Sequence, residues 1–342
     1  MKTLLRLYVA GVFALAVLQS VAYAVPSLAS WWVELLHYVP YPAYLGPALL
    51  ALPISLLLGR LWRWAALIAV ALVLVPVMGL ATGRADAGQG HLRMMTYNIK
   101  AYLASGRPDG WALLEDEIKR QDPDILVMQD AGELAHVHAR HPNVAAGIFA
   151  GRQVYASGQY IVVSRFPLKD CAAGDLSYRD QLATHVHCVV RVGDQDIDLL
   201  TAHLNSPRAG LNATRYEQVD GLDDWQQNFG DRLEQSQKLA EAIGQLKGQQ
   251  RRPMIVAGDL NAAESSPVVR RLLDRGLRDA YSSSSWGYGY TLGHALRMRM
   301  SFLRIDHILV SPELGVEKAY AGGGQASEHR PVIADLWLHR AQ

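Results

Sequence analysis

The sequence predicts an α/β fold preceded by an α-helical transmembrane region. The first ninety residues are almost entirely apolar, and the rest of the chain alternates strand-like apolar runs with segments of helical periodicity. With 342 residues, 50% of them hydrophobic, the chain is long enough for a membrane region and one large folded domain. We expect about three transmembrane helices in residues 1–81, a short linker in residues 82–91 and the folded domain in residues 92–340.

The N-terminal region contains three apolar stretches that approach the roughly twenty residues needed to cross a bilayer. They comprise residues 7–25, 44–59 and 61–80. Lys2 and Arg6 precede the first stretch, and Arg60 and Arg63 lie between the second and the third. By the positive-inside rule these basic residues face the cytoplasm, which places the chain after Leu80 on the outer side. We therefore expect a multi-pass protein of a bacterial-type inner membrane, with a periplasmic or extracellular folded domain.

Two features of the membrane region allow alternative interpretations. Between the first two stretches, apolar and aromatic residues around Trp31 and Trp32 repeat at helical spacing, which favours a helix in the headgroup layer over a plain connecting loop. Ala22-Tyr23-Ala24 forms an acceptable processing site, so the first stretch is either a span or a cleavable secretory signal. Both interpretations of the first stretch place the next loop outside.

The folded domain is close to neutral. Residues 1–90 contain five basic and two acidic side chains, which leaves 28 basic and 30 acidic ones in the rest of the chain. A domain with this balance lacks the broad positive field that non-specific duplex binding requires. The charge balance therefore disfavours a dedicated nucleic-acid-binding protein.

The two cysteines are Cys171 and Cys188. Cys188 alternates with Val186 and Val190, which predicts an inward-facing free thiol on a strand. In an exported domain a Cys171–Cys188 disulfide is the alternative. The sequence leaves this open because pairing also depends on geometry.

The folded domain contains many predicted strands and few helices. The strands comprise residues 92–99, 125–129, 160–164, 184–192, 197–202, 253–257, 305–310 and 332–338. We expect helices starting near Asp109, in residues 231–246, and from Pro267, which Ser266 would cap. Ser282 begins a predicted loop.

Polar side chains lie at or next to the ends of predicted strands, where α/β folds build sites. They are Asn98, Asp130, His203, Asp259 with Asn261, and His329. The strings around them are, in chain order, TYNIK, DILVMQD, TAHLNSP, VAGDLNA, RIDHILVS and SEHRPV. These six strings resemble the motifs of the endonuclease/exonuclease/phosphatase superfamily of metal hydrolases, and they span nearly the whole folded domain.

The resemblance implies a four-layer α/β sandwich, in which two mixed β-sheets pack face to face between helices. It also implies a metal-dependent phosphoric ester hydrolase that uses Mg²⁺ or Mn²⁺, and hard oxygen ligands suit such ions. Asp130 is similar to the family's acidic metal ligand after the second strand. Asn98 is similar to the asparagine that steadies that ligand.

The remaining site residues are carried over in the same way. Asp259 and Asn261 are similar to the pair that orients the attacking water and the phosphate. His329 is similar to the histidine that contacts the phosphate as a base or transition-state stabiliser, and Asp306 to the carboxylate that fixes its ring. His203 is similar to the histidine placed near the leaving oxygen.

Two acids depart from the family pattern. The family usually has Glu where Asp130 stands and Asp where Glu328 stands, so each exchange changes the reach of the carboxylate by one methylene. We expect Glu328 to compensate by reaching toward the metal, as a third metal residue beside Asn98 and Asp130, and Glu133 is a second candidate.

Several other polar residues receive a structural interpretation. His136, His138 and His141 lack the spacing of a helical metal site and are expected on the surface. His185 and His187 alternate around Val186 and are expected on the solvent face of a strand. Three arginines before the strand at 305–310 either line the substrate cleft or form an exposed strand edge. They are Arg297, Arg299 and Arg304.

The expected function is hydrolysis of a phosphodiester or phosphomonoester on the outer side of the membrane. Membrane tethering favours a lipid headgroup as substrate, because lipids near the anchor reach a high effective concentration. A nuclease acting on DNA or RNA is the alternative within the enzyme class, since the superfamily shares one site among several substrates. A catalytically degenerate membrane-bound binding module is the alternative outside it. The expected partners are the phosphate ester and the membrane, and no protein partner is predictable.

Overall fold

The computed structural model describes residues 1–88, 92–216, 221–296 and 299–338. The chain divides into two units. The first contains Met1–Ala81 with Ser265–Pro267, and the second contains Thr82–Glu264 and Val268–Gln342.

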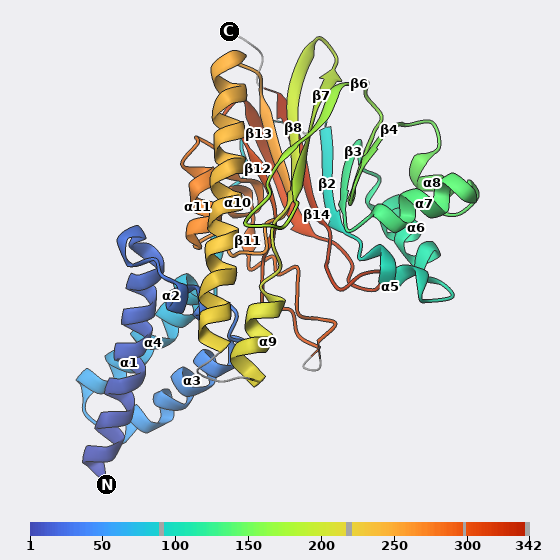
Figure 1. The fold of residues 1–342 in the computed structure, drawn as a ribbon. Helices are drawn as coiled ribbons and strands as arrows, with labels where there is room; N and C mark the ends of the chain where they lie inside the picture. The colour runs from blue at the N-terminus through green and yellow to red at the C-terminus, as the bar shows by residue number, and fades with distance from the viewer. Residues whose placement is uncertain (89–91, 217–220, 297–298, 339–342) are drawn as a thin grey trace. The chain divides into compact units, whose positions relative to one another are not determined.

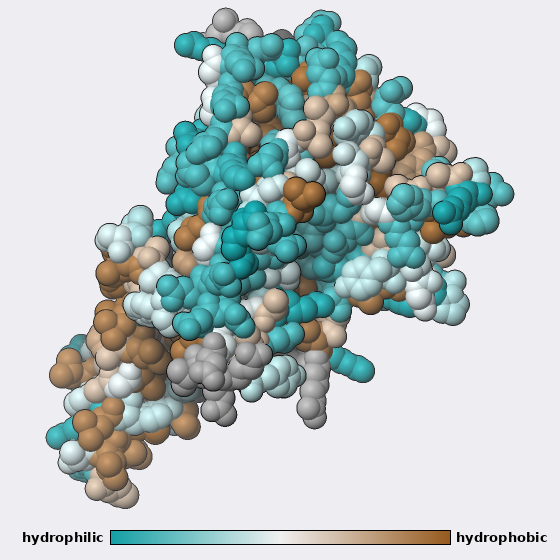
Figure 2. Space-filling view, in the orientation of Figure 1, coloured by the Kyte–Doolittle hydropathy of each residue, from teal (hydrophilic) through white to brown (hydrophobic). Residues whose placement is uncertain are grey.

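The first unit is helical. Its elements are α1 (Lys2–Ala24), η1 (Pro26–Leu28), α2 (Trp31–His37), α3 (Pro42–Leu56), α4 (Arg60–Leu72) and η2 (Val73–Val77). Two helices are long and apolar enough to cross a membrane, α1 and the continuous segment Arg60–Val77. α2 and α3 together make a third candidate, bent by 75°. Figure 2 shows a largely hydrophobic surface on these helices.

The aromatic segment around Trp31 and Trp32 is a helix, α2, rather than a plain loop. The second apolar stretch forms α3, which has 15 residues and contains Pro47 and Pro53. Proline removes a backbone donor and fixes φ, which fits a helix shorter than the 23-residue α1 and the 18-residue segment Arg60–Val77.

The second unit contains two six-stranded mixed sheets (Figure 1). One has the order β13 (Leu314–Ala321), β14 (Val332–Leu338), β2 (Leu92–Asn98), β3 (Ile125–Gln129), β5 (Tyr160–Ser164) and β4 (Gln153–Ser157). The other has the order β10 (Arg278–Asp279), β12 (Asp306–Val310), β9 (Met254–Asp259), β8 (Gln195–His203), β7 (Thr184–Val192) and β6 (Leu168–Asp175). The β2–β3 and β8–β9 pairs are parallel, and the other pairs are antiparallel.

Helices cover the outer faces of both sheets, and two short strands lie outside them. The helices are α5 (Ala101–Ser105), α6 (Gly110–Gln121), α7 (Gly132–Arg140), α8 (Ala146–Phe149), α9 (Arg208–Tyr216), α10 (Gly221–Gln249), α11 (Pro267–Leu273) and α12 (Ala280–Ser284), and the strands are β1 (Ala81–Thr82) and β11 (Trp286–Gly287). On the first sheet, Met95 and Tyr97 pack in one buried cluster with Leu114 and Ile118 of α6. The alternation of β2 sends those two side chains toward the helices and Thr96 toward the second sheet. The sequence-based α/β sandwich is confirmed.

The two sheets are joined by buried polar contacts as well as by apolar packing. Gln129 donates from Nε2 to the hydroxyls of Thr96 (3.1 Å) and Thr201 (3.0 Å), which lie on different sheets. All three side chains are fully buried. A satisfied buried network is stabilising, whereas a half-satisfied one is costly, so these bonds hold the strand ends in register.

Several local expectations were wrong. α10 begins at Gly221, ten residues before the predicted start, because its first turns are rich in polar residues and lack a regular apolar stripe. Ser282–Ser285 is not simply a loop, since Ala280–Ser284 forms α12, whose N-cap Asp279 accepts a hydrogen bond from the Ser282 backbone N–H. His185 does not face open solvent, because its ring lies over Gly174 of β6 in a cavity that residues of α10 also line, and it is 6% exposed.

The two cysteines form a disulfide, so the predicted free thiol at Cys188 is also wrong. Cys188 does face inward and is fully buried. The pairing of β6 with β7 shifts register between Lys169 and Ala172, and this irregularity brings Cys171 opposite Cys188. A bulge of this kind leaves no clear sign in the sequence.

Candidate active site

The site lies where four strands end. In the parallel pairs, Asn98 of β2 is level with Gln129 of β3, and His203 of β8 is level with Asp259 of β9. The carboxyl ends of parallel strands meet at one edge of a sheet, so each pair brings its polar side chains together. Because the two sheets are packed face to face, the two edges form one site.

Asp259 is the centre of this site and is buried. Its Oδ2 accepts a hydrogen bond from Asn98 Nδ2 at 2.8 Å. The Nε2 atoms of His203 and His329 lie 3.5 Å and 3.7 Å from the same oxygen. Its Oδ1 accepts from the backbone N–H of Asn261 at 3.0 Å. One carboxylate is therefore contacted by side chains from both sheets.

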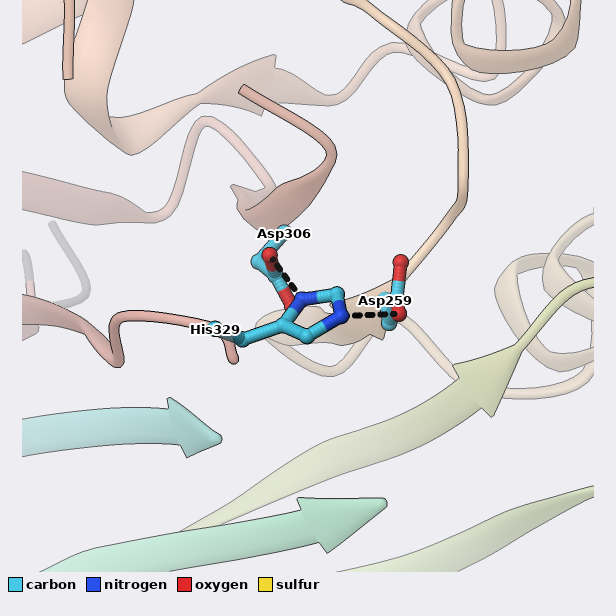
Figure 3. Close-up of side chains that lie close together, drawn as sticks. All are labelled: Asp259, Asp306 and His329. Carbon is cyan, nitrogen blue, oxygen red and sulfur yellow. Dashed lines mark hydrogen bonds and ion pairs between the residues drawn. The ribbon is translucent and has the colours of Figure 1, made fainter. Parts of the chain in front are cut away.

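His329 is held between two carboxylates (Figure 3). Its Nδ1 donates to Asp306 Oδ2 at 2.9 Å, which turns Nε2 toward Asp259. Burial lowers the pKa of His329, but the charges of Asp306 and Asp259 outweigh burial, so the pKa lies above its ordinary value. The imidazolium form therefore persists to higher pH than in a free histidine.

His203 is oriented from the other side. Its Nδ1 donates to Gln159 Oε1 at 2.6 Å, and its backbone N–H donates to the Tyr160 hydroxyl at 3.0 Å. These contacts direct Nε2 toward Asp259. Gln159, in the turn between β4 and β5, and Tyr160, the first residue of β5, were not predicted as site residues, because only the fold brings them to His203.

Asp130 carries an unpredicted partner, Lys100. The Lys100 ammonium lies 2.6 Å from Asp130 Oδ2, and Asp130 Oδ1 lies 3.5 Å from His203 Nδ1. Burial lowers the pKa of Lys100, yet the charges of Asp130 and Asp259 raise it overall, so the side chain stays charged. Lys100 closes the string TYNIK, and this position beside Asn98 was the available signal for it.

Three site residues adopt left-handed backbone. Lys100, Asp130 and Asn261 have φ values of 46°, 50° and 48°. Such conformations are uncommon outside glycine and concentrate at functional sites, where they turn the chain sharply. The turn at Asn261 lets its Nδ2 donate to the Leu204 carbonyl at 2.9 Å, which links the loops after β8 and β9.

The other predicted acids lie at the margin. Glu328 accepts a hydrogen bond from Arg208 of α9 at 2.9 Å, so reaching toward Asp130 would require this ion pair to open. Glu133 is exposed in the first turn of α7. The structure thus brings together Asn98, Asp130, His203, Asp259, Asn261, Asp306 and His329. Within the described part of the chain, Glu328 and Glu133 make no hydrogen bond or ion pair with these side chains.

The predicted arginines behave differently from one another. Arg304 has a side chain only 10% exposed, which pairs with Asp279 at 2.7 Å and with Glu264, so it belongs to an internal network rather than to an exposed edge. Arg299 has a left-handed backbone. Arg297 lies outside the described residues.

The donor atoms fit a hard divalent cation. Oxygens of Asp130, Asp259 and Asn98 come from three strand ends, and carboxylate and amide oxygens are what Mg²⁺ prefers. Ligand atoms of Asp259, Asp306 and His329 also lie within 4.8 Å of one another. Asp306 and His329 already bond to each other, so Asp259 is the member of that group that could turn to an ion, in exchange for its longer contacts of 3.5 Å and 3.7 Å with His203 and His329.

Residues 95–329 match the Endonuclease/Exonuclease/phosphatase family, and the chain belongs to this family of divalent-metal-dependent phosphoric ester hydrolases. Similar solved structures include truncated TDP2 from Caenorhabditis elegans, with 16% identity, 72% of this chain and 97% of that chain covered, and a TM-score of 0.54. A mannosyl-6-phosphatase from Bacteroides thetaiotaomicron has 17% identity, coverage of 72% and 100%, and a TM-score of 0.53. TDP2 from D. rerio complexed with a single-strand DNA product has 13% identity, coverage of 72% and 98%, and a TM-score of 0.53. No curated protein matches the sequence.

Proposed function

We propose that the protein is a membrane-tethered phosphoesterase that hydrolyses the phosphate ester of a lipid headgroup on the outer side of the membrane. The observation that carries the catalytic part is the convergence of Asn98, His203 and His329 on the Asp259 carboxylate. Phosphoryl transfer needs a positioned nucleophile and neutralised charge on phosphate oxygens, and this cluster offers groups for both.

Each side chain has a distinct role in the proposal. Asp259 accepts a hydrogen bond from the attacking water, with Asn261 beside it. His329 presents a proton at Nε2 to the phosphate, and Asp306 fixes its ring at Nδ1. His203 lies where a leaving oxygen would receive a hydrogen bond. A divalent ion held by Asp130 and steadied through Asn98 would neutralise charge on the non-bridging oxygens.

The membrane part of the proposal rests on the N-terminal helices and the disulfide. Two helices, or three with the bent pair, are long and apolar enough to span. Disulfides persist in oxidising compartments, which supports a catalytic unit outside the cytoplasm. The positive-inside distribution of the basic residues supports the same side. We also propose that residues 1–81 anchor the chain, 82–91 link, and 92–340 catalyse.

The lipid substrate is supported by tethering, which raises the effective concentration of headgroups near the site. Tyr102 and Leu103, which follow Lys100, are exposed by 51% and 36%. Exposed tyrosine and leucine side chains are typical of surfaces that meet a bilayer interface.

The test uses the full chain in nanodiscs. Phospholipids, sphingomyelin, inositol phosphates and single- and double-stranded DNA are offered with Mg²⁺ or with EDTA. We expect EDTA-sensitive turnover that is highest on a lipid and lost in His329→Ala. The matched control is His136→Ala, a histidine on α7, which should keep full activity.

The outcomes separate the candidate functions. Preferred cleavage of DNA would replace the lipid substrate by the nuclease alternative. Absence of turnover on every compound, with no difference between the wild type and His329→Ala, would favour the binding module. For topology, an outward-facing alkaline phosphatase reporter fused after Leu338 should be active, and an inactive reporter would reverse the orientation.

A further inference from the structure

We propose that His185 and His187 form a second metal site, which binds a borderline divalent ion such as Zn²⁺ or Ni²⁺ between β7 and α10. The site is separate from the strand-end cluster around Asp259. It lies in a cavity of about 510 Å³. The residues that line this cavity come from β6, β7 and the C-terminal half of α10, which are labelled in Figure 1.

The two histidines project from the same face of β7. They are two residues apart, and alternate residues of a strand point to one side. Both line the cavity. Two imidazoles at this spacing can approach one ion without a change in the backbone.

His185 is buried but unsatisfied. It is 6% exposed, lines the cavity, and its Nδ1 atom has no hydrogen-bond partner among the described residues. A buried polar atom without a partner is costly, so such an atom facing a cavity points to a ligand.

The opposite strand is shaped to accommodate this ring. Gly174 of β6 pairs directly with His185 of β7. A Cβ atom at Gly174 would lie 2.2 Å from Cε1 and 2.6 Å from Nε2 of the imidazole. Only glycine therefore leaves room for the His185 ring in its present position.

His187 is oriented by a carboxylate. Its Nε2 donates to Asp198 Oδ1 at 2.9 Å. Metal-binding histidines usually donate their second ring nitrogen to a carboxylate, which fixes the tautomer and makes the other nitrogen a better ligand. Here that arrangement leaves Nδ1 of His187 as the coordinating atom.

The helix face over the cavity carries four polar side chains beside Ala242 and Leu246. Lys238, Glu241, Gln245 and Gln249 line the cavity at spacings of three or four residues, so they share one face of α10. Glu241 offers a carboxylate as a third ligand. Among the described residues, three ligand atoms within 4.8 Å of one another are found at the Asp259 cluster alone, so Glu241 would join by rotating its side chain.

The ligand set selects the kind of ion. Imidazole nitrogens suit Zn²⁺, Ni²⁺ and Cu²⁺, whereas Mg²⁺ prefers oxygen ligands. The cavity between β7 and α10 would therefore bind a different class of ion from the strand-end site. Its ion would join α10 to the sheet and stabilise the folded state by mass action.

The experiment is isothermal titration of full-length protein in detergent with Zn²⁺, in the presence of excess Mg²⁺. We expect His185→Ala and His187→Ala each to lose one equivalent of bound Zn²⁺ or to weaken its binding at least tenfold. The rise in Tm that Zn²⁺ causes in the wild type should shrink in both. Asp198→Asn should weaken binding about tenfold without removing a ligand.

His136→Ala is the control and should bind as many ions as the wild type. Mg²⁺-dependent hydrolysis should be unchanged in His185→Ala, His187→Ala and Asp198→Asn, and this unchanged activity also shows that the three variants are folded. If His185→Ala misfolds, the partly exposed His187 still allows the test. Equal Zn²⁺ stoichiometry and affinity in the wild type and in the folded His185→Ala and His187→Ala variants would overturn the proposal.

Discussion

Replacing Lys100 by methionine should make the active site bind its divalent ion more tightly. The Lys100 ammonium lies 2.6 Å from Asp130 Oδ2, the oxygen of the proposed metal ligand. Both side chains are mostly buried, at 13% and 24% exposure, so solvent screens this pair weakly. An ion that coordinates Asp130 through this oxygen must first displace the ammonium. Methionine keeps the length of the side chain and removes the charge.

The magnitude follows from the bond that the ion would otherwise replace. A hydrogen bond to a charged group contributes about 1.5–3 kcal/mol. Each 1.4 kcal/mol corresponds to about a tenfold change in an equilibrium constant. The Lys100→Met variant should therefore bind Mn²⁺ or Mg²⁺ roughly 10- to 100-fold more tightly than the wild type. Lys100→Arg keeps the charge and should bind with nearly the wild-type affinity.

The assay is calorimetric titration with Mn²⁺ in the absence of substrate, so that binding is measured apart from turnover. Lys119→Met is the matched control, because Lys119 pairs with Glu115 at 2.5 Å on the surface of α6. Its metal affinity should not change. An unaltered or weaker affinity in Lys100→Met would refute the idea that ammonium and ion compete for Asp130.

Three further changes test other parts of the structure. Asp306→Asn should lower kcat by roughly 10²- to 10⁴-fold. It should also shift the part of the pH–rate profile that reports His329 to lower pH, because a charge that raises the histidine pKa is lost. An unchanged pH–rate profile would contradict this. Asp279 is buried, but neighbouring cations hold the pKa of its carboxyl group in the folded state far below 3.8. The stabilisation that this carboxylate gives the folded state is therefore present above pH 3.8 and is lost as the pH falls through the folded-state pKa. Asp279→Asn should therefore destabilise the protein by about 3 kcal/mol at pH 7 and by less at pH 3, measured by urea unfolding at both pH values. Replacing Cys171 and Cys188 by alanine should cost about 3 kcal/mol, because the disulfide closes a loop of 17 residues, and an unchanged Tm with and without reductant would show that the thiols are not paired.

The elements that could be predicted from the sequence are those with strong local signals. β3 and β5 each consist of four apolar residues followed by one polar residue, all buried, and their predicted bounds agree with the structure. β6 and β13 were not predicted. β6 alternates weakly because most of its residues are exposed, and the pairing of β13 is interrupted by a register shift at Val316.

The same distinction applies to the site. Asn98, Asp259 and His329 could be proposed because each lies next to a strand end within a recognisable string. Gln159 could not, since it meets His203 through a contact between residues 44 positions apart in the chain. Arg208 reaches Glu328 across 120 positions. No periodicity encodes such pairs, and only the packing of the two sheets and their helices brings them together.

The two acids that depart from the family pattern share one property that the sequence did not show: each is paired with a base. Asp130 is paired with Lys100, and Glu328 with Arg208. A carboxylate that already has a cationic partner is a weaker metal ligand, because the ion must compete with that partner.

The basic atoms nearest to Asp259, the Nε2 atoms of His203 and His329, lie farther away, at 3.5 Å and 3.7 Å, than the partners of the two exchanged acids, at 2.6 Å and 2.9 Å. The metal site of this protein should therefore depend more heavily on Asp259 than on either exchanged acid. Asp259→Asn should abolish metal binding, whereas Asp130→Asn should weaken metal binding by a smaller factor. If Asp130→Asn instead removes metal binding as completely as Asp259→Asn, then Lys100 must leave Asp130 at little cost. In that case the ammonium would be a mobile phosphate-binding group rather than a fixed competitor of the ion.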